Sequence, residues 1–337
     1  MKRCLLLILS LTMLVSCLLC GCSSKPAPEF TGEYYLAQKP SDEEKSAIDK
    51  VLSSFMKSYE ENKPEDAYPL FTNGFSGTTD DLKSFFEEIR KVCKNPFVPF
   101  DSYYLRGMEV SETPVKVKHS EQDKTYIEIT PASEDSFCAI YVAEGEKVSY
   151  MLSILLAKED DSWKIAWVNP GEVKYNGADA PAIYEKTKTL YNEGKIISAY
   201  IYSCMLGNTF RPGDYMRYEN DLEMEDMCYK LYSEMTSKFE SPIVIEGEAK
   251  SEVHAIRIIR DEVEGMIPLI LVKTDVDIKD RDALVAEAEK VIGGLEALSP
   301  GIRETFTHAS FSMTNENIDE NNPTPKAAES FVLPLNP

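Results

Sequence analysis

The pattern of apolar and polar positions divides the chain into segments of different character. Lys2 and Arg3 precede an uncharged, largely apolar run over residues 4–24. The following residues, 22–40, show little periodicity and contain three prolines, which is typical of a tether. From Ser41 onward, helical and extended periodicities follow one another. We therefore predict a leader over 1–21, a tether over 22–40 and a folded chain from residue 41.

Helical periodicity dominates the start of the folded chain. Ser41 and Glu44 fit a capping box, and apolar residues then recur every three or four positions up to Tyr59. Two further helices are predicted, one over residues 64–71 and one beginning near Thr79. Three amphipathic helices are therefore expected before the first strand.

Extended periodicity follows these helices. Alternation with a period of two predicts strands over 102–110, 115–119, 125–130, 137–143 and 148–157. In a last strand Trp163, Ile165 and Trp167 are expected on one face, and residues 169–171 are expected to end it. Residues 41–175 are thus predicted to be one α+β domain with a curved antiparallel sheet.

A second α+β domain is predicted over residues 178–313. A helical hairpin opens it, a further helix follows, and a strand hairpin, a helix and a last strand complete a small sheet. These elements are predicted over 179–193, 196–206, 224–239, 253–259, 267–273, 280–298 and 303–313. Residues 314–337 are polar with few apolar positions, so an extended, partly ordered tail is expected.

The charge of the chain limits the partners it can have. With 36 Lys and Arg against 57 Asp and Glu, the net charge is −21. Phosphate contacts need clustered cations, so nucleic acid is excluded as a partner. Adsorption of the folded part to anionic lipid is opposed for the same reason. Neutral or cationic partners are favoured.

The end of the leader carries a lipidation signal. The tetrapeptide Leu19-Cys20-Gly21-Cys22, followed by Ser23-Ser24, resembles the lipobox of bacterial lipoproteins. The resemblance implies a diacylglycerol thioether on Cys22, cleavage just before it, and a stable membrane anchor outside the cytoplasm. Cys17, at the end of a second lipobox over 14–17, is the alternative anchor. If residues 4–24 instead formed an uncleaved membrane helix, the rest of the chain would still lie outside the cytoplasm.

The order of elements carries a second resemblance. Three helices followed by antiparallel strands, ending in the Trp-rich stretch 162–167, resemble the nuclear-transport-factor-two-like fold over residues 41–172. In that family the sheet and the helices enclose a pocket that is catalytic in some members and a binding or packing cavity in others. Trp163 and Trp167 are therefore candidate pocket residues.

Four cysteines lie in the folded chain from residue 41 onward, and whether they form disulfides is left open. The domain division favours the pairs Cys93–Cys138 and Cys204–Cys228 as disulfides outside the cytoplasm. Four buried free thiols are the equal alternative.

No metal site is predicted. His119, His254 and His308 are the only histidines. The last two lie in predicted strands of the second domain and could be neighbours, but no histidine has metal-ligand spacing. The acidic stretch 275–282 lacks the oxygen ligand and glycine of a calcium loop, so it is interpreted as the N-terminal cap of a helix.

No catalytic motif accompanies this architecture. The chain has no nucleophile elbow, no Ser-x-x-Lys sequence and no phosphate-binding glycine loop, so no catalytic residue and no cofactor are assigned. The hypothesis is a lipid-anchored envelope protein that binds a small molecule or a protein without catalysis. The alternatives are an exported enzyme with an acid–base pocket in the first domain and, less favoured, the solute-binding lipoprotein of a transporter.

Overall fold

The computed structural model describes residues 39–108, 110, 113–120, 124–245, 250–318, 325 and 327–336. The predicted leader, most of the tether and both lipidation candidates, Cys17 and Cys22, lie outside the described residues. Within the described part of the chain, no helix is both long enough and apolar enough to span a membrane. The α+β class predicted from the sequence is confirmed, since helices and sheets both build the core.

The three N-terminal helices form where the apolar periodicity predicts them. They are α2 (Asp42–Glu61), α3 (Pro64–Ala67), which continues into the 3₁₀ turn η1 (Tyr68–Leu70), and α4 (Thr79–Val92). The capping box is present at the start of α2, where the Ser41 hydroxyl accepts from Glu44 N and the Glu44 carboxylate accepts from Ser41 N. Thr78 and Asp81 form a second capping box at α4.

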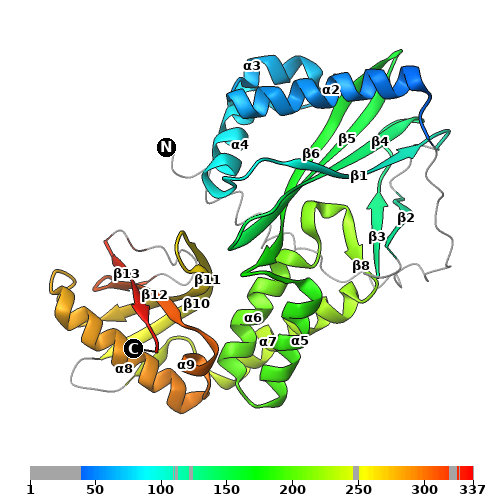
Figure 1. Ribbon diagram of the computed structural model, residues 1–337. Coiled ribbons are helices and arrows are strands. Elements are labelled where there is room, and N and C mark those ends of the chain that lie inside the picture. Colours follow the sequence, from blue (N-terminus) through cyan, green and yellow to red (C-terminus); the bar gives the residue numbers. More distant parts are fainter. Residues whose placement is uncertain are drawn as a thin grey trace. The chain divides into compact units, whose positions relative to one another are not determined.

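A five-stranded antiparallel sheet lies beside these helices (Figure 1). Its strand order is β1-β4-β5-β6-β7, with β1 (Val98–Leu105), β4 (Ser136–Ala143), β5 (Val148–Glu159), β6 (Ser162–Tyr175) and β7 (Ala178–Asp179). Residues opposite each other on antiparallel strands point to the same face. Tyr104 of β1 donates a hydrogen bond to Glu44 of α2. We call the face of the sheet that carries Tyr104 the helix face, and the opposite face the far face.

Two bulges in β6 change which residues lie on each face. Leu156 of β5 pairs with Ile165 of β6, and Leu155 pairs with Trp167, so Ala166 is an extra residue of β6 without a partner in β5. Val173 is a second such residue. Trp163 and Ile165 therefore lie on the helix face, whereas Trp167 lies on the far face. The predicted alternation of both tryptophans on one face is wrong.

The predicted end of this strand at residues 169–171 is also wrong. β6 continues through Pro170 and Gly171 to Tyr175. Its partner β7 pairs only with residues 174 and 175, so β6 is an edge strand at Pro170, where a residue without an N–H is tolerated.

A three-stranded ribbon is separate from this sheet. β2 (Val115–Ser120) and β3 (Thr125–Ile129) were expected in the same sheet as the other strands, but β3 pairs with β8 (Met216–Tyr218) instead. β8 lies in the predicted second domain, nearly a hundred residues further along the chain. The sequence offers no local signal for such a long-range pairing.

Helices lie on both sides of β8 in the chain. Before it come α5 (Ala180–Asn192), α6 (Ile196–Thr209) and the 3₁₀ turn η2 (Pro212–Asp214), and after it α7 (Asp221–Lys238) leads to a second sheet. The second sheet has the order β13-β12-β11-β10-β9. Its strands are β9 (Ile243–Ile245), β10 (Ser251–Asp261), β11 (Gly265–Thr274), β12 (His308–Thr314) and β13 (Glu329–Pro334).

Two helices lie between β11 and β12, which are parallel. They are α8 (Arg281–Leu298) and the short α9 (Ile302–Thr305). Asp280 accepts from Ala283 N, so the expected capping role of the acidic stretch is confirmed. The polar tail contributes β13, because Phe331 and Leu333 of that strand are buried against the sheet.

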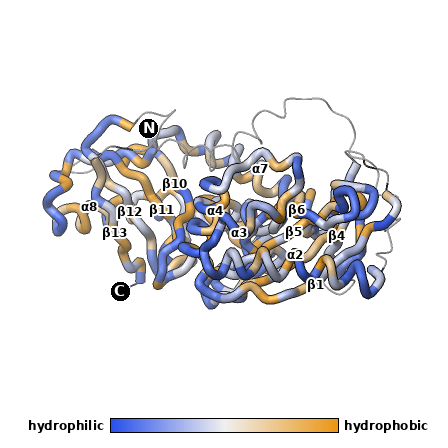
Figure 2. The backbone as a smooth tube through the Cα atoms, turned by 90° about the horizontal axis from the view of Figure 1, so that it is seen from above, coloured by the Kyte–Doolittle hydropathy of each residue, from blue (hydrophilic) through white to orange (hydrophobic). Residues whose placement is uncertain are grey.

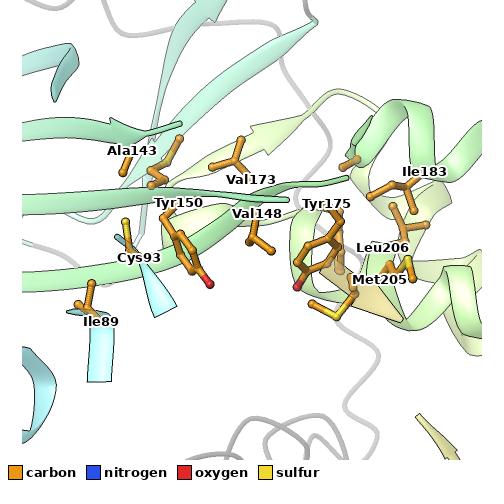
Figure 3. Close-up of a cluster of buried hydrophobic side chains, with 14 of the residues drawn as sticks. Ile89, Cys93, Ala143, Val148, Tyr150, Val173, Tyr175, Ile183, Met205 and Leu206 are labelled. Carbon is orange, nitrogen blue, oxygen red and sulfur yellow. The ribbon is translucent and has the colours of Figure 1, made fainter. Parts of the chain in front are cut away.

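Buried apolar residues form one large cluster. Figure 2 shows hydrophobic stretches along strands of both five-stranded sheets, and β5 is buried over ten consecutive positions. In Figure 3, Tyr150, Val148 and Tyr175 of the large sheet lie between Ile89 and Cys93 on one side and residues of α5 and α6 on the other. Burial of this apolar surface is the main force that stabilises the fold.

Glu44 gives the stability of this fold a specific pH dependence. The hydrogen bond from Ser41 N is the main cause that lowers its pKa from 4.5 to about 2, aided by Tyr104 and Arg106 and opposed by burial. A carboxyl group whose pKa is lowered by folding stabilises the folded state above its unfolded pKa and loses that effect on acidification.

We therefore expect wild type to lose unfolding free energy between about pH 4.5 and 2, and Glu44→Gln to lose less. Urea unfolding at a series of pH values measures this. Glu43→Gln removes the same charge from the neighbouring position and serves as the control. Equal pH dependence in both variants would contradict the assignment.

Candidate functional site

A cavity of about 340 Å³ opens on the far face of the large sheet, beside the β2-β3-β8 ribbon. We call it the Trp167 cavity. Its less polar walls are Pro114, Pro131, Ala132, Trp167 and Tyr215. Its polar lining residues are Glu128, Thr130, Asn169, Asp214 and Arg217. The volume is at the lower end of the range of small-molecule pockets.

The two candidate tryptophans have different environments. Trp167 is 62% exposed and lines the cavity. Trp163 is buried on the helix face, where its ring meets Tyr104 edge to face at 6.0 Å. Of the two candidates, Trp167 therefore lines a cavity on the far face, whereas Trp163 is part of the packed core.

An ion pair forms one side of the cavity. Arg217 of β8 donates through Nε to Glu128 Oε2 of β3 at 3.0 Å. Its Nη1 atom is buried and has no hydrogen-bond partner among the described residues. A buried donor without a partner is unfavourable.

Asp214 reaches the cavity from an unusual loop. Gly213 and Asp214 both adopt left-handed backbone conformations, with φ of 60° and 61°. Aspartate enters that region more readily than most residues other than glycine. Arg211 fixes the loop to α7 through ion pairs with Asp221 at 3.3 Å and Glu225 at 2.8 Å. The loop therefore places Asp214 at the cavity.

The loop also lies directly on β6. A Cβ atom at Gly171 would be 2.1 Å from Gly213 N, so only glycine permits this approach. Asn169, two residues before Gly171 in the pleat, lies on the same far face and lines the cavity. The close main-chain contact thus fixes the distance between Asn169 and Asp214.

A second polar cluster lies on the far face near the edge strand β1. Tyr103 Oη donates to Asp101 Oδ2 at 2.7 Å, and His119 Nδ1 lies 2.6 Å from Tyr103 Oη and 3.1 Å from Asp101 Oδ2. Burial, together with the hydrogen bond to Asp101, raises the pKa of Tyr103. Burial raises the pKa of Asp101, but hydrogen bonds from His119, Tyr103 and Ser102 outweigh it and lower that pKa overall. Such a carboxylate orients the histidine and is not itself an acid.

The region between the helices and the sheet contains packed aromatic rings. Phe55 of α2 meets Phe71 and Phe86 edge to face, with ring centroids 6.1 and 5.7 Å apart. Tyr104 and Trp163 complete the layer on the sheet side. A ligand pocket at this position, as the fold resemblance implied, is filled by side chains of the chain itself.

The four described cysteines are free thiols in the structure. Neither the pair Cys93 and Cys138 nor the pair Cys204 and Cys228 is bonded. Cys93 Sγ bonds Asn95 O at 3.5 Å and Cys228 Sγ bonds Ser203 O at 3.4 Å. Burial raises the pKa of Cys138 to about 12 and that of Cys204 to about 11. These thiols are packed as small apolar side chains.

The histidines of the second sheet are not neighbours. His254 lies on β10 and His308 on β12, with β11 between them. His254 faces Glu252 at 3.4 Å, and His308 faces Glu264 at 2.9 Å. Among the described residues no group of three metal-ligating side chains comes together.

Sequence reasoning missed most of the cavity. Glu128, Asn169, Asp214, Tyr215 and Arg217 carry no motif and are brought together by strand pairing. One signal was available at Pro212-Gly213-Asp214, where a turn sequence precedes an aromatic strand, but it predicts only a loop.

Comparisons with known proteins give weak likenesses of fold. No family model matches the chain, and no curated protein matches it. One similar structure is Rv3472, a function-unknown protein from Mycobacterium tuberculosis, with 15% identity and a TM-score of 0.24 over 40% of this chain and 77% of that one.

A putative scytalone dehydratase from Novosphingobium aromaticivorans is also similar. It has 16% identity and a TM-score of 0.19, over 39% of this chain and 85% of that one.

Proposed function

We propose that the chain is a lipid-anchored protein of a bacterial cell envelope that binds a small ligand in the Trp167 cavity. The observation that carries the binding function is the cavity itself. It combines the exposed indole of Trp167 with the guanidinium of Arg217 and the carboxylate of Asp214. Such a combination of an apolar wall and a few fixed polar groups is characteristic of binding sites.

The proposal of an anchor rests on the sequence. The charged start, the apolar run and the lipobox ending at Cys22 support it, and the tether would leave the folded part free of the membrane surface. The first part of the folded chain is proposed to be a nuclear-transport-factor-two-like domain in which the far face, not the space under the helices, binds the ligand.

An exported enzyme is the second candidate function, and one observation favours it. The Asp101–Tyr103–His119 cluster has the hydrogen-bond geometry of an oriented acid–base group. However, it lies at the strand edge, and neither Asp101 nor His119 lines the Trp167 cavity. Turnover of a compound bound by the chain would favour this candidate over binding alone.

Replacement of Cys22 tests the anchor. In the native host, Cys22→Ser is expected to move most of the protein from the membrane fraction to the soluble fraction, because two or more acyl chains are lost. Mass spectrometry of the wild-type N-terminus should show a diacylglycerol on Cys22. Cys17→Ser is the control and should stay in the membrane fraction. Modification at Cys17, or an unmodified start at Met1, would contradict the assignment to Cys22.

Tryptophan fluorescence tests the ligand site. Trp163 is buried and Trp167 is exposed, so acrylamide quenches mainly Trp167 in wild type. A panel of amino acids, nucleosides, amines and sugars is expected to contain compounds that protect Trp167 from quenching. Trp167→Phe leaves only Trp163 as a fluorophore and provides the blank. A panel in which no compound changes quenching would contradict binding in the cavity.

A further inference from the structure

We propose that the ligand of the Trp167 cavity is a neutral saccharide of one or two rings. The ring stacks on the indole of Trp167, and its hydroxyl groups bond Asn169, Asp214 and Arg217. This inference rests on the proposed binding function and adds the class of ligand to it.

The indole supplies a flat surface that suits a sugar ring. Trp167 is 62% exposed in a chain that has only two tryptophans, and the other is buried in the core. Aromatic rings in water bury apolar surface well against a flat partner, and a pyranose ring has faces of C–H groups. The cavity, at about 340 Å³, has room for one or two such rings and not for a longer buried chain.

The polar groups of the cavity require a ligand that donates and accepts hydrogen bonds at once. The Arg217 guanidinium lines the cavity and can only donate. The Asp214 carboxylate can only accept, and the Asn169 amide does both. No hydrogen bond from the side chain of Asp214 or Asn169 to another described residue is found. Each sugar hydroxyl is a donor and an acceptor, so neighbouring hydroxyls can satisfy all three groups.

The charges of the cavity disfavour an anionic ligand. Glu128 already pairs with Arg217, so these two charges compensate each other. Asp214 would repel an anion, as would the net charge of −21. A saccharide without ionic groups avoids this repulsion.

The test is a titration of the full chain, purified in a detergent without a sugar headgroup. The probes are glucose, galactose, N-acetylglucosamine, cellobiose and diacetylchitobiose, and acrylamide quenching of Trp167 and saturation-transfer NMR are the readouts. At least one probe is expected to bind. Trp167→Ala, followed by NMR, should weaken its binding at least tenfold. Arg217→Lys, which keeps the charge and loses the planar fork, should weaken it severalfold.

Tyr232→Ala is the matched control, because it removes an exposed aromatic ring from α7, away from the cavity. It should leave the dissociation constant unchanged. Sugar binding that survives Trp167→Ala overturns the proposal. If amino acids, nucleosides or amines protect Trp167 and sugars do not, the saccharide is wrong and the binding function stands. If no compound of any class binds, both are overturned.

Discussion

Gly171→Ala is expected to lower the unfolding free energy by about 3 kcal/mol and to abolish binding in the Trp167 cavity. The new methyl carbon would lie 2.1 Å from Gly213 N and 2.9 Å from the carbonyl carbon of Pro212, both main-chain atoms. A flexible side chain could turn aside, but here either β6 or η2 must shift. Because η2 carries Asp214 and leads into Tyr215, the shift deforms the cavity as well as the packing.

Gly293→Ala is the matched control for this substitution. Gly293 lies inside α8, and no atom is within 4 Å of the Cβ position. Alanine is the better helix former, so a gain of about 1 kcal/mol is expected, with binding unchanged. Urea unfolding and ligand titration measure both variants. A Gly171→Ala protein with wild-type stability would show that the close contact between β6 and η2 is absent in solution.

Phe55→Ala is expected to destabilise the protein by about 4 kcal/mol, the largest effect of any single change considered for the core. Phe55 is fully buried and lies between Phe71 and Phe86, so it joins α2 to η1 and α4. Its removal leaves a cavity that neighbouring rings cannot fill. It also removes two edge-to-face contacts of the kind that stabilise aromatic clusters.

Urea unfolding of a second variant separates this effect from a general loss of aromatic surface. Phe100→Ala removes the same side chain from β1, where it is 55% exposed, and should change the unfolding free energy by less than about 0.5 kcal/mol. Phe55→Leu keeps most of the volume and should lie between the two. If Phe55→Ala and Phe100→Ala had equal effects, the layer between helices and sheet would not be packed as described.

Local signals predicted the helices well. The start of α2 at Ser41 and that of α8 at Asp280 depend on hydrogen bonds within four residues of sequence, and such bonds can be recognised from residue types alone. The apolar stripe of α2 likewise requires no knowledge of its partner, since any core would bury it.

The cavity could not be predicted in the same way. It requires β8 to pair with β3, and residues 125 and 218 are brought together by tertiary structure alone. Trp167 was identified as a candidate, but it was placed on the same face as Trp163. The extra residue Ala166 reverses the face, and the apolar alternation in the sequence gives no sign of it. No sequence motif links the polar residues of the cavity to one another.

The two bulges of β6 isolate a short stretch of the strand from the rest. Between Ala166 and Val173 the odd-numbered residues 167, 169 and 171 lie on the far face, whereas Trp163, Ile165 and Tyr175 lie on the helix face. The far-face side chains of Trp167 and Asn169 can therefore be exchanged, in evolution or in the laboratory, without changing the core residues on the helix face. Gly171 differs from them, because it must also permit the close main-chain contact with η2.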